Sequence, residues 1–191
     1  MKIDKSNIAN LPTKHGKFKI KAYKQNNQEH LVLMSEGFED LESPYVRVHS
    51  ECLTGDTFGS LKCDCQNQLD LALKFISKEG GMVIYHRQEG RNIGLLNKVN
   101  AYCLQDNGRN TIEANLELGF GEDDRDYSVV EEIFNDLGIK KIKLITNNPK
   151  KVKFIESLGI EIVERIPAIT ATNKHNKEYL NTKKEKMGHL L

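Results

Sequence analysis

Three cysteines close together in the sequence are the residues best suited to chemistry. Cys52, Cys63 and Cys65 follow the spacing Cys-x10-Cys-x-Cys. Cysteine thiolates bind zinc, and three protein ligands leave the fourth coordination position to water, which is the arrangement of a catalytic zinc site. The 191 residues contain only four cysteines, too few for a disulfide framework. We therefore favour an open, catalytic zinc site.

Other interpretations of these cysteines stay open on spacing alone. They could be incidental, or they could form a closed structural site with a distant fourth ligand such as His49 or His86. The run His49-Ser-Glu51 also matches the H-x-E motif of zinc nucleobase deaminases, but the P-C-x-x-C motif that accompanies it there is absent. The fourth cysteine, Cys103, stands apart, and we expect it to be a buried small apolar residue.

The elements around the cluster favour an anionic site. Asp64 is expected to cap a helix that begins near Cys65, where the positive end of the helix dipole favours thiolates. Arg87 and Arg91 flank a strand-to-helix turn, and the segment 146–151 follows a strand, opens a helix and carries lysine. Such turns offer free backbone N–H groups and positive charge to phosphate, so we predict a phosphorylated substrate.

Charge is balanced overall but unevenly distributed. There are 28 basic and 27 acidic residues, and the net charge is +1, which argues against a general nucleic-acid binder. Residues 113–136 carry nine acidic side chains and one basic one, Arg125, whereas residues 140–153 carry six lysines and no acid. The alternative outside the enzymes is a zinc-stabilised nucleic-acid-binding module, which the charge balance and the aromatic content of 7% disfavour.

The apolar pattern predicts the elements that must position these residues. Strands are expected at 18–22, 30–34, 45–49, 82–86, 142–146 and 160–163, and helices at 65–79, 94–106, 127–137, 149–158 and 176–187, the fourth capped by Asn148. This order indicates an α/β fold, a three-layer α/β/α domain with a mixed sheet, antiparallel N-terminal strands, and alternating strands and helices after residue 65.

We expect a single domain over residues 1–191, with residues 1–15 loose and residues 176–191 forming a C-terminal helix and tail. No apolar run approaches the ~20 residues of a membrane span. The N-terminus lacks the apolar core of a signal peptide. We therefore expect a soluble cytoplasmic protein.

A set of motifs that follow one another in order resembles the GTP cyclohydrolase II family, the first committed enzymes of riboflavin synthesis. The motifs are Arg47–Asp56 (RVHSECLTGD), Leu61–Cys65 (LKCDC), Tyr85–Lys98 (YHRQEGRNIGLLNK), Ala114-Asn115, Leu118–Phe120, Asp123–Asp126, Leu144–Lys151 (LITNNPKK) and Lys186–His189 (KMGH). They are long, and they span the chain from about residue 44 to its C-terminus.

The resemblance implies conversion of GTP to a 2,5-diamino-6-ribosylamino-pyrimidinone phosphate, with release of formate from C8 and of pyrophosphate. It also implies one zinc per subunit held by three cysteines, a need for Mg²⁺, and a homodimer. Some relatives stop at a ring-opened formylamino product, and the sequence leaves both extents of reaction open. Many members carry an N-terminal dihydroxybutanone-phosphate synthase domain, for which the segment before residue 44 is too short.

The resemblance also assigns roles to individual residues. Cys52, Cys63 and Cys65 would hold the zinc. Asp123 would be the proton acceptor, Arg125 the nucleophile that forms a covalent phosphoguanosine adduct, and Tyr102 an active-site tyrosine. Contacts to GTP would come from Arg47, Val48, His49, Ser50, Glu51, Gln68, Glu89, Gly90, Arg91, Thr111, Thr146 and Lys151.

Overall fold

The centre of the molecule is one mixed sheet. The computed structural model describes residues 3–190, and in this range eight strands form the sheet in the order β1-β3-β4-β6-β5-β7-β8, with β2 paired to β3. The strands are β1 (Asp4–Lys5), β2 (Ala9–Thr13), β3 (Gly16–Gln25), β4 (Gln28–Ser35), β5 (Tyr45–Ser50), β6 (Gly81–His86), β7 (Lys141–Ile145) and β8 (Glu161–Ile166). Strands β1 to β4 pair antiparallel, whereas β5 pairs in parallel with β6 and β7 and β7 with β8. The prediction of a mixed α/β sheet is confirmed.

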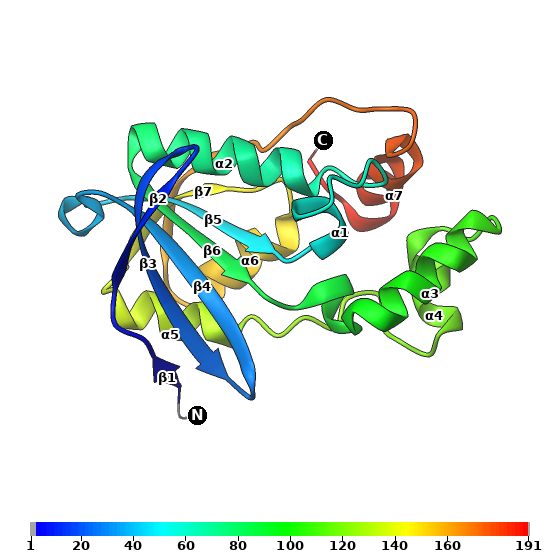
Figure 1. Cartoon of the computed structure of the whole chain (residues 1–191), viewed down its shortest axis with the longest axis horizontal. Helices are drawn as coiled ribbons and strands as arrows, with labels where there is room; N and C mark the ends of the chain where they lie inside the picture. The colour runs from blue at the N-terminus through cyan, green and yellow to red at the C-terminus, as the bar shows by residue number, and fades with distance from the viewer. Residues whose placement is uncertain (1–2, 191) are drawn as a thin grey trace.

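Helices cover both faces of this sheet (Figure 1). They are α1 (Leu53–Asp56), α2 (Cys65–Glu79), α3 (Gly94–Asp106), α4 (Thr111–Glu117), α5 (Ser128–Asp136), α6 (Pro149–Ser157) and α7 (Lys177–Met187), with short 3-10 turns η1 (Phe38–Asp40) and η2 (Glu89–Asn92). Helix α2 packs on one face, and α5 and α6 pack on the other. The three-layer arrangement follows.

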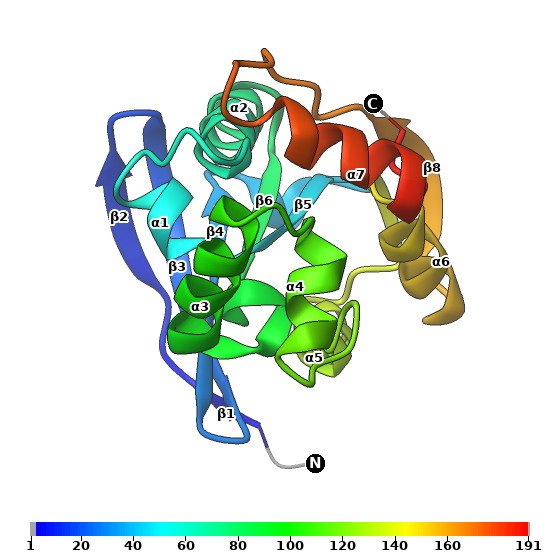
Figure 2. The same cartoon turned by 90° about the vertical axis from the view of Figure 1, so that its right-hand side faces the viewer.

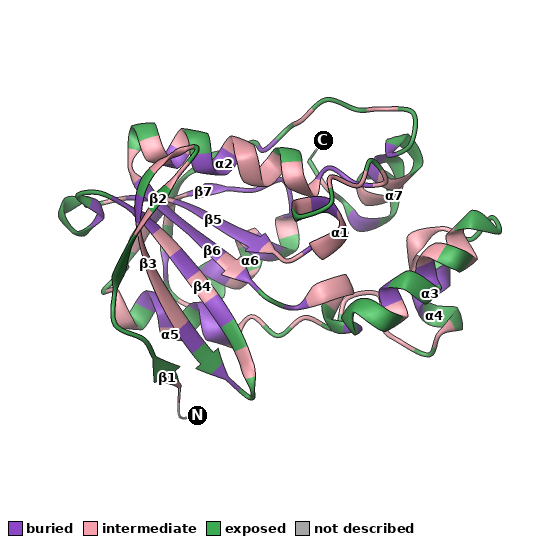
Figure 3. Ribbon diagram, in the orientation of Figure 1, coloured by how far each residue is buried: buried purple, intermediate pink, exposed green. Residues whose placement is uncertain are grey.

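The alternation of side chains along β6 shows how one strand serves both layers. Met82 and Ile84 belong to the core beneath α5 and α6, whereas Val83 belongs to the core beneath α2. Successive side chains of a strand point to opposite faces, so an uninterrupted apolar run is needed where both faces are covered. The central strands are accordingly the most buried part of the chain (Figure 3).

The N-terminal segment differs from its prediction. We expected residues 1–15 to be loose, but of those that the structure describes, Asp4–Lys5 and Ala9–Thr13 form strands on β3. One edge of the ten-residue strand β3 pairs with β4. The backbone groups of its other edge are available to β1 and β2. Pairing with an edge strand needs backbone groups rather than apolar side chains, so the hydropathy pattern gives no sign of it.

Helices α3 and α4 project beyond the sheet, and the burial predicted for Cys103 on α3 is wrong. The bounds of α3 are as predicted, but Leu95 and Val99 are exposed and Cys103 is exposed rather than buried. The face of α3 turned toward the rest of the molecule carries Lys98 and Ala101 instead. A helix that packs by one short face beside a polar site buries few apolar residues. None of the helices in residues 3–190 has the length and hydrophobicity needed to cross a membrane.

Candidate active site

A cleft lies at the carboxyl ends of the parallel strands β5, β6 and β7. Seen from that side, α1, α3, α4, α6 and α7 surround the ends of β5 and β6 (Figure 2). Open α/β sheets bind ligands at this edge because the loops that follow the strands converge there. The cleft is lined from β5 by Arg47, His49 and Ser50, from the turn after β6 by Glu89–Arg91, and from the turn after β7 by Thr146–Asn148.

The three cysteines meet in this cleft. Their sulfur atoms all lie within 4.8 Å of one another, and the Sγ atoms of Cys52 and Cys63 are 3.7 Å apart. Thiolates about 2.3 Å from a tetrahedral zinc ion lie about 3.8 Å apart, so the spacing suits a common metal. Gly55 makes the close approach possible, because a Cβ there would lie 2.8 Å from the Cys63 sulfur.

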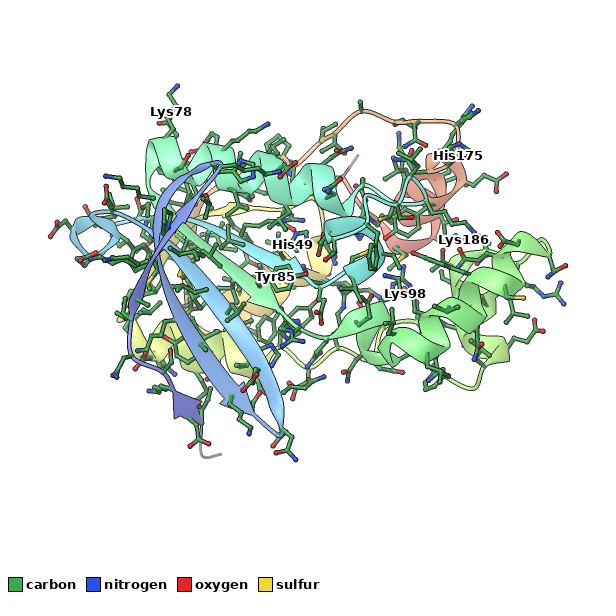
Figure 4. All side chains as sticks on the ribbon, in the orientation of Figure 1. His49, Lys78, Tyr85, Lys98, His175 and Lys186 are labelled. Atoms are coloured by element: carbon green, nitrogen blue, oxygen red, sulfur yellow. The ribbon has the colours of Figure 1, made fainter. Side chains whose placement is uncertain are left out.

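The charge around the cluster favours ionised sulfur. The Lys98 ammonium lies 3.1 Å from the Cys52 sulfur and 2.6 Å from Glu89, and Figure 4 marks it on α3. Hydrogen bonds from the neighbouring thiols and the Lys98 charge hold the pKa of Cys52 far below its usual value, whereas the bond to Cys52 raises the pKa of Cys63 to about 11. One thiolate thus forms readily, and a divalent cation would ionise the others.

The two histidines considered as a fourth ligand have other roles. His49 bonds through Nε2 to Asp56, 3.1 Å away, and its ring stacks on Tyr85; both rings lie at the ends of neighbouring strands (Figure 4). His86 lies between the rings of His30 and Tyr127. In residues 3–190 the three cysteines are the only group of three or more such ligands. A closed site with either histidine is therefore wrong, and so is the deaminase reading of His49.

Asp64 stands at the predicted position but does not cap the helix through its side chain. It stands at the N-cap position of α2, but its carboxylate does not accept a hydrogen bond from the helix backbone. It accepts instead from Gln68 Nε2 at 2.6 Å and from Lys183 Nζ at 2.8 Å. The predicted cap at Asn148 is confirmed, since its side chain accepts from the backbone N–H of Lys150.

A cluster of three cations, of which Arg47 and Lys151 are buried, also lines the cleft. Lys151 donates to the carbonyl of Val48 at 2.7 Å and to Ser50 Oγ at 3.2 Å, and Arg125 donates to the same Oγ at 2.8 Å. Arg47 is held by the Ile145 carbonyl and by Gln68. Burial and the charges of Arg125 and Arg47 together hold the pKa of Lys151 well below its usual value. Cations placed this closely suit a polyanionic ligand.

Arg125 is the one member of this cluster with its own carboxylate. Asp123 accepts from Arg125 Nε at 2.7 Å and from the guanidinium Nη2 as well. Burial works against the charge of Arg125, but the hydrogen bonds and charge of Asp123 outweigh it and raise its pKa. The same pairing overcomes burial at Asp123 and lowers its pKa. The acidic block of the sequence therefore supplies a buried ion pair facing the cleft.

The turn between β6 and α3 presents further predicted residues. Glu89 accepts from the backbone N–H of Leu53 at 2.6 Å, which joins this turn to the start of α1. Gly90 and Arg91 both have positive φ, at 62° and 64°. Backbone strain of this kind persists where the surroundings impose it, commonly at functional sites. Tyr102 shares a hydrogen bond with Thr54 at 3.1 Å.

The structure brings most predicted residues to one place. All of the predicted site residues line the cleft except two. Val48 is buried in the core and contributes its carbonyl to Lys151, and Asp123 reaches the cleft through Arg125. Glu51 lines the cleft and pairs with Arg87, which does not line it.

The other lining residues had no individual role predicted, although Asn147 and Asn148 belong to the predicted phosphate-binding segment 146–151. They are Lys62, Ile93, Lys98, Ala101, Gln105, Asn115, Asn147, Asn148, Tyr179, Lys183, Met187 and His189. Lys98 ends one of the resembling motifs and the pair Met187 and His189 belongs to another, so a signal existed without a role attached to it. The sequence contains no signal for Tyr179 or Lys183, because both lie in a polar helix, and a polar helix is usually exposed to solvent.

Comparisons with known proteins agree with this geometry. A family model described as GTP cyclohydrolase II matches residues 4–167. The chain is 58% identical to "GTP cyclohydrolase-2" of Campylobacter fetus, covering 100% of this chain and 97% of the relative, and 54% identical to the protein of that name in Campylobacter hominis, with the same coverage. It is 52% identical to "Riboflavin biosynthesis protein RibBA" of Chlorobium phaeovibrioides, over 96% of this chain and 45% of that protein. The chain therefore belongs to the GTP cyclohydrolase II family.

Proposed function

We propose that this enzyme hydrolyses GTP in the first step of riboflavin biosynthesis, releasing formate from C8 of guanine and pyrophosphate from the triphosphate. Family membership supports the activity. The observation that carries the proposal is a cleft lined both by three clustered thiols and by the cations Arg47, Arg125 and Lys151, of which Arg47 and Lys151 are buried. A purine nucleotide presents a ring to hydrolyse and a polyanion to hold.

The cysteine cluster fits one zinc ion per chain. The sulfur spacing, the Lys98 ammonium and the softness of thiolate ligands all suit zinc, and Cys52, Cys63 and Cys65 would hold it. When bound, zinc supplies Lewis acidity that polarises water and the atoms of the ring beside it. The fourth ligand position would be free for this, since the described residues supply only three ligands.

Tyr102 lies where it can donate a hydrogen bond beside the cysteine cluster. Its hydroxyl shares a hydrogen bond with Thr54, which also lies near the Cys52 sulfur. Burial raises the pKa of Tyr102, so the hydroxyl stays protonated at neutral pH. In the proposed reaction it donates a hydrogen bond to the purine ring as the ring opens.

Arg125 and Asp123 would break the bond between the α- and β-phosphates. The guanidinium nitrogen forms a bond to the α-phosphorus, the bond from phosphorus to the bridging oxygen breaks, and pyrophosphate leaves. Arginine is a poor nucleophile while it is charged. Its proton passes to Asp123, whose carboxylate accepts from Nε at 2.7 Å, only as the nitrogen–phosphorus bond forms, because the resting pair stabilises both charges. Water then attacks the α-phosphorus, the nitrogen–phosphorus bond breaks, the proton returns to Arg125 and the nucleoside monophosphate product is released. Lys151 and Arg47 would hold the substrate in place. Further contacts to the guanine nucleotide are expected from His49, Ser50, Glu51, Gln68, Glu89, Gly90, Arg91, Thr111 and Thr146.

Mg²⁺ would enter with the substrate. Apart from the cysteines, residues 3–190 contain no group of three His, Cys, Asp or Glu ligands close enough to hold a metal. Mg²⁺ is commonly bound by one or two carboxylates together with substrate phosphates. We expect it to arrive on the triphosphate.

The enzyme would act as a homodimer in the cytoplasm. Leu96 is 73% exposed on α3, and Phe58 is 77% exposed on the segment after α1, which is linked to the end of α3 by the bond from Lys62 to Asp106. A contiguous patch of exposed apolar side chains marks an interaction surface, and we propose that these two residues belong to one. A reducing compartment suits the free thiols of the cluster. Leu96→Lys should lower the mass measured by light scattering from that of a dimer to that of a monomer.

Product analysis tests the activity. The purified chain, given GTP, Mg²⁺ and zinc, should release formate and pyrophosphate in equal amounts. Cys63→Ser should abolish formate release, whereas Cys103→Ser, an exposed cysteine outside the cluster, should not. Pyrophosphate without formate would instead identify the enzyme that stops at the formylamino product. Zinc-loaded protein that releases neither product would refute the proposed function.

A further inference from the structure

Helix α7 and the turn after it form one wall of the cleft. Tyr179, Lys183, Met187 and His189 line the cleft from this wall. The family-model match ends at residue 167, so the wall lies outside it. The Lys186–His189 motif, which carried no role in the sequence, belongs to this wall. Figure 2 shows α7 above the end of β5.

Lys183 is the charged group of this wall. Its ammonium lies 2.8 Å from Asp64 and 4.3 Å from the centre of the Tyr179 ring. Its side chain is 12% exposed and that of Asp64 is 2% exposed. Asp64 lies between Cys63 and Cys65 in the sequence, so Lys183 is anchored beside the metal cluster. The ammonium has three N–H groups, and within residues 3–190 Asp64 is its one hydrogen-bond acceptor; because Lys183 lines the cleft, a ligand bound there can accept from the others.

The charges of three elements converge here. Burial, together with the charges of Lys183, Lys151 and Arg91, lowers the pKa of His189 to about 3. Arg91 bonds to the Glu122 carbonyl and contacts the Met187 sulfur rather than a carboxylate. Within residues 3–190 neither Arg91 nor Lys151 has an ion-pair partner. This corner of the cleft therefore holds more positive charge than its carboxylates neutralise.

Both apolar and polar contacts hold α7 in place. Its buried residues are Leu180 and Met187. The turn after it is tied down by the bond from the Leu190 N–H to the Asn147 carbonyl at 2.9 Å, and Asn147 also lines the cleft. Because α7 is attached at the cleft itself, a ligand that fills the cleft contacts this helix directly.

We propose that Lys183 is a further substrate-binding residue, which contacts the phosphates of the nucleotide from α7 while Asp64 and Tyr179 hold it in position. An ammonium donates only, and the triphosphate offers the strongest acceptors in GTP. This inference rests on the proposed function, because it assigns a ligand part to the same site.

Binding of two nucleotides that differ in phosphate number tests it. We would measure the Kd of α,β-methylene-GTP, which keeps all three phosphates, and of GMP, on the zinc-loaded enzyme. Lys183→Gln should weaken the triphosphate analogue by about 10- to 100-fold, the usual size of a lost hydrogen bond to a charged group. Binding of GMP should be weakened less, so the Kd of GMP divided by the Kd of the triphosphate analogue should fall. Lys183→Arg should keep most of the affinity.

The control is Lys184→Gln, because Lys184 is the neighbouring lysine of the same helix and is exposed. This variant should bind both nucleotides as the wild type does. Zinc content should be unchanged in all variants. Lys183→Gln should lower the unfolding midpoint, because Asp64 loses its charged partner, so the affinities are compared at a temperature at which every variant is folded. Unchanged affinity in Lys183→Gln, or an equal loss for both nucleotides, would overturn the assignment. Wild-type protein that binds neither nucleotide would overturn the proposed function first, so the two failures are distinguishable.

Discussion

A single methyl group added at Gly55 should disrupt the metal cluster. An alanine Cβ at this position would lie 2.8 Å from the Cys63 sulfur, 3.1 Å from the Cys52 sulfur and 3.1 Å from Cys65 Cβ. The φ of Gly55 lies outside the left-handed range, so the backbone itself accepts alanine. The effect of Gly55→Ala is therefore steric, and it falls on all three cysteines at once.

The expected size follows from two opposing contributions. Alanine in place of a helical glycine stabilises by about 1 kcal/mol. Overpacking a buried site costs about 1–3 kcal/mol. Because two thiol sulfurs must move by several tenths of an ångström, we expect overpacking to prevail and the free energy of unfolding to fall by up to about 2 kcal/mol. Metal–ligand distances tolerate only about 0.2 Å, so zinc affinity should fall by more than about tenfold.

Two measurements check this prediction. Zinc affinity is measured by competition with a chelator of known Kd, and stability by urea unfolding of the zinc-loaded protein. Thr57→Ala is the control, because Thr57 follows α1 and is exposed. If Gly55→Ala bound zinc as tightly as the wild type and were about 1 kcal/mol more stable, as helix propensity alone predicts, the packing argument would be refuted.

Three further predictions concern charge. Arg125→Lys keeps the positive charge but loses the two-pronged contact with Asp123, so pyrophosphate release should fall by roughly 100-fold with zinc content unchanged; normal release would exclude the proposed role. Lys98→Met should weaken zinc binding by about 10- to 100-fold in chelator competition, and wild-type affinity would show that the ammonium does not support the cluster. Asp136→Asn should destabilise by about 1–3 kcal/mol at pH 7, because the carboxylate accepts from Lys5, Lys21 and Tyr23. Burial opposes these hydrogen bonds, but the bonds prevail and lower the pKa of Asp136. The stabilisation from its carboxylate is therefore present above the unfolded pKa of about 3.9 and is lost as pH falls. Urea unfolding at pH 7 and pH 3 should show a smaller difference in unfolding free energy between wild type and Asp136→Asn at pH 3, and an equal difference at both pH values would contradict this.

The elements that could be predicted were those with a strong local signal. The apolar run of β6, the glycines that end α2 and α5, and the cap at Asn148 all lie within a few residues of what they determine. Helix α4 has a capping box between Asn110 and Glu113, and this local signal was overlooked among the acidic residues. Strands β1 and β2 depend on backbone pairing and left no hydropathy signal.

The site divides in the same way. Cys52, Cys63 and Cys65 are close in sequence, so their spacing favoured a metal site over the alternatives that it left open. Arg125 and Ser50 are 75 residues apart, and only the family resemblance placed them together. Lys183 and Asp64 are 119 residues apart, and no motif linked them. Contacts of this range depend on the order of strands in the sheet, which local patterns do not specify.

The central claim is that zinc held by three thiolates is required for release of formate from GTP. The most direct test is to add zinc stepwise to metal-free enzyme and to follow formate released from GTP labelled at C8. We predict no formate without zinc, a linear rise as zinc is added, and a break at one zinc per chain. Formate release by the metal-free enzyme, or by Cys63→Ser at the wild-type rate, would contradict the account.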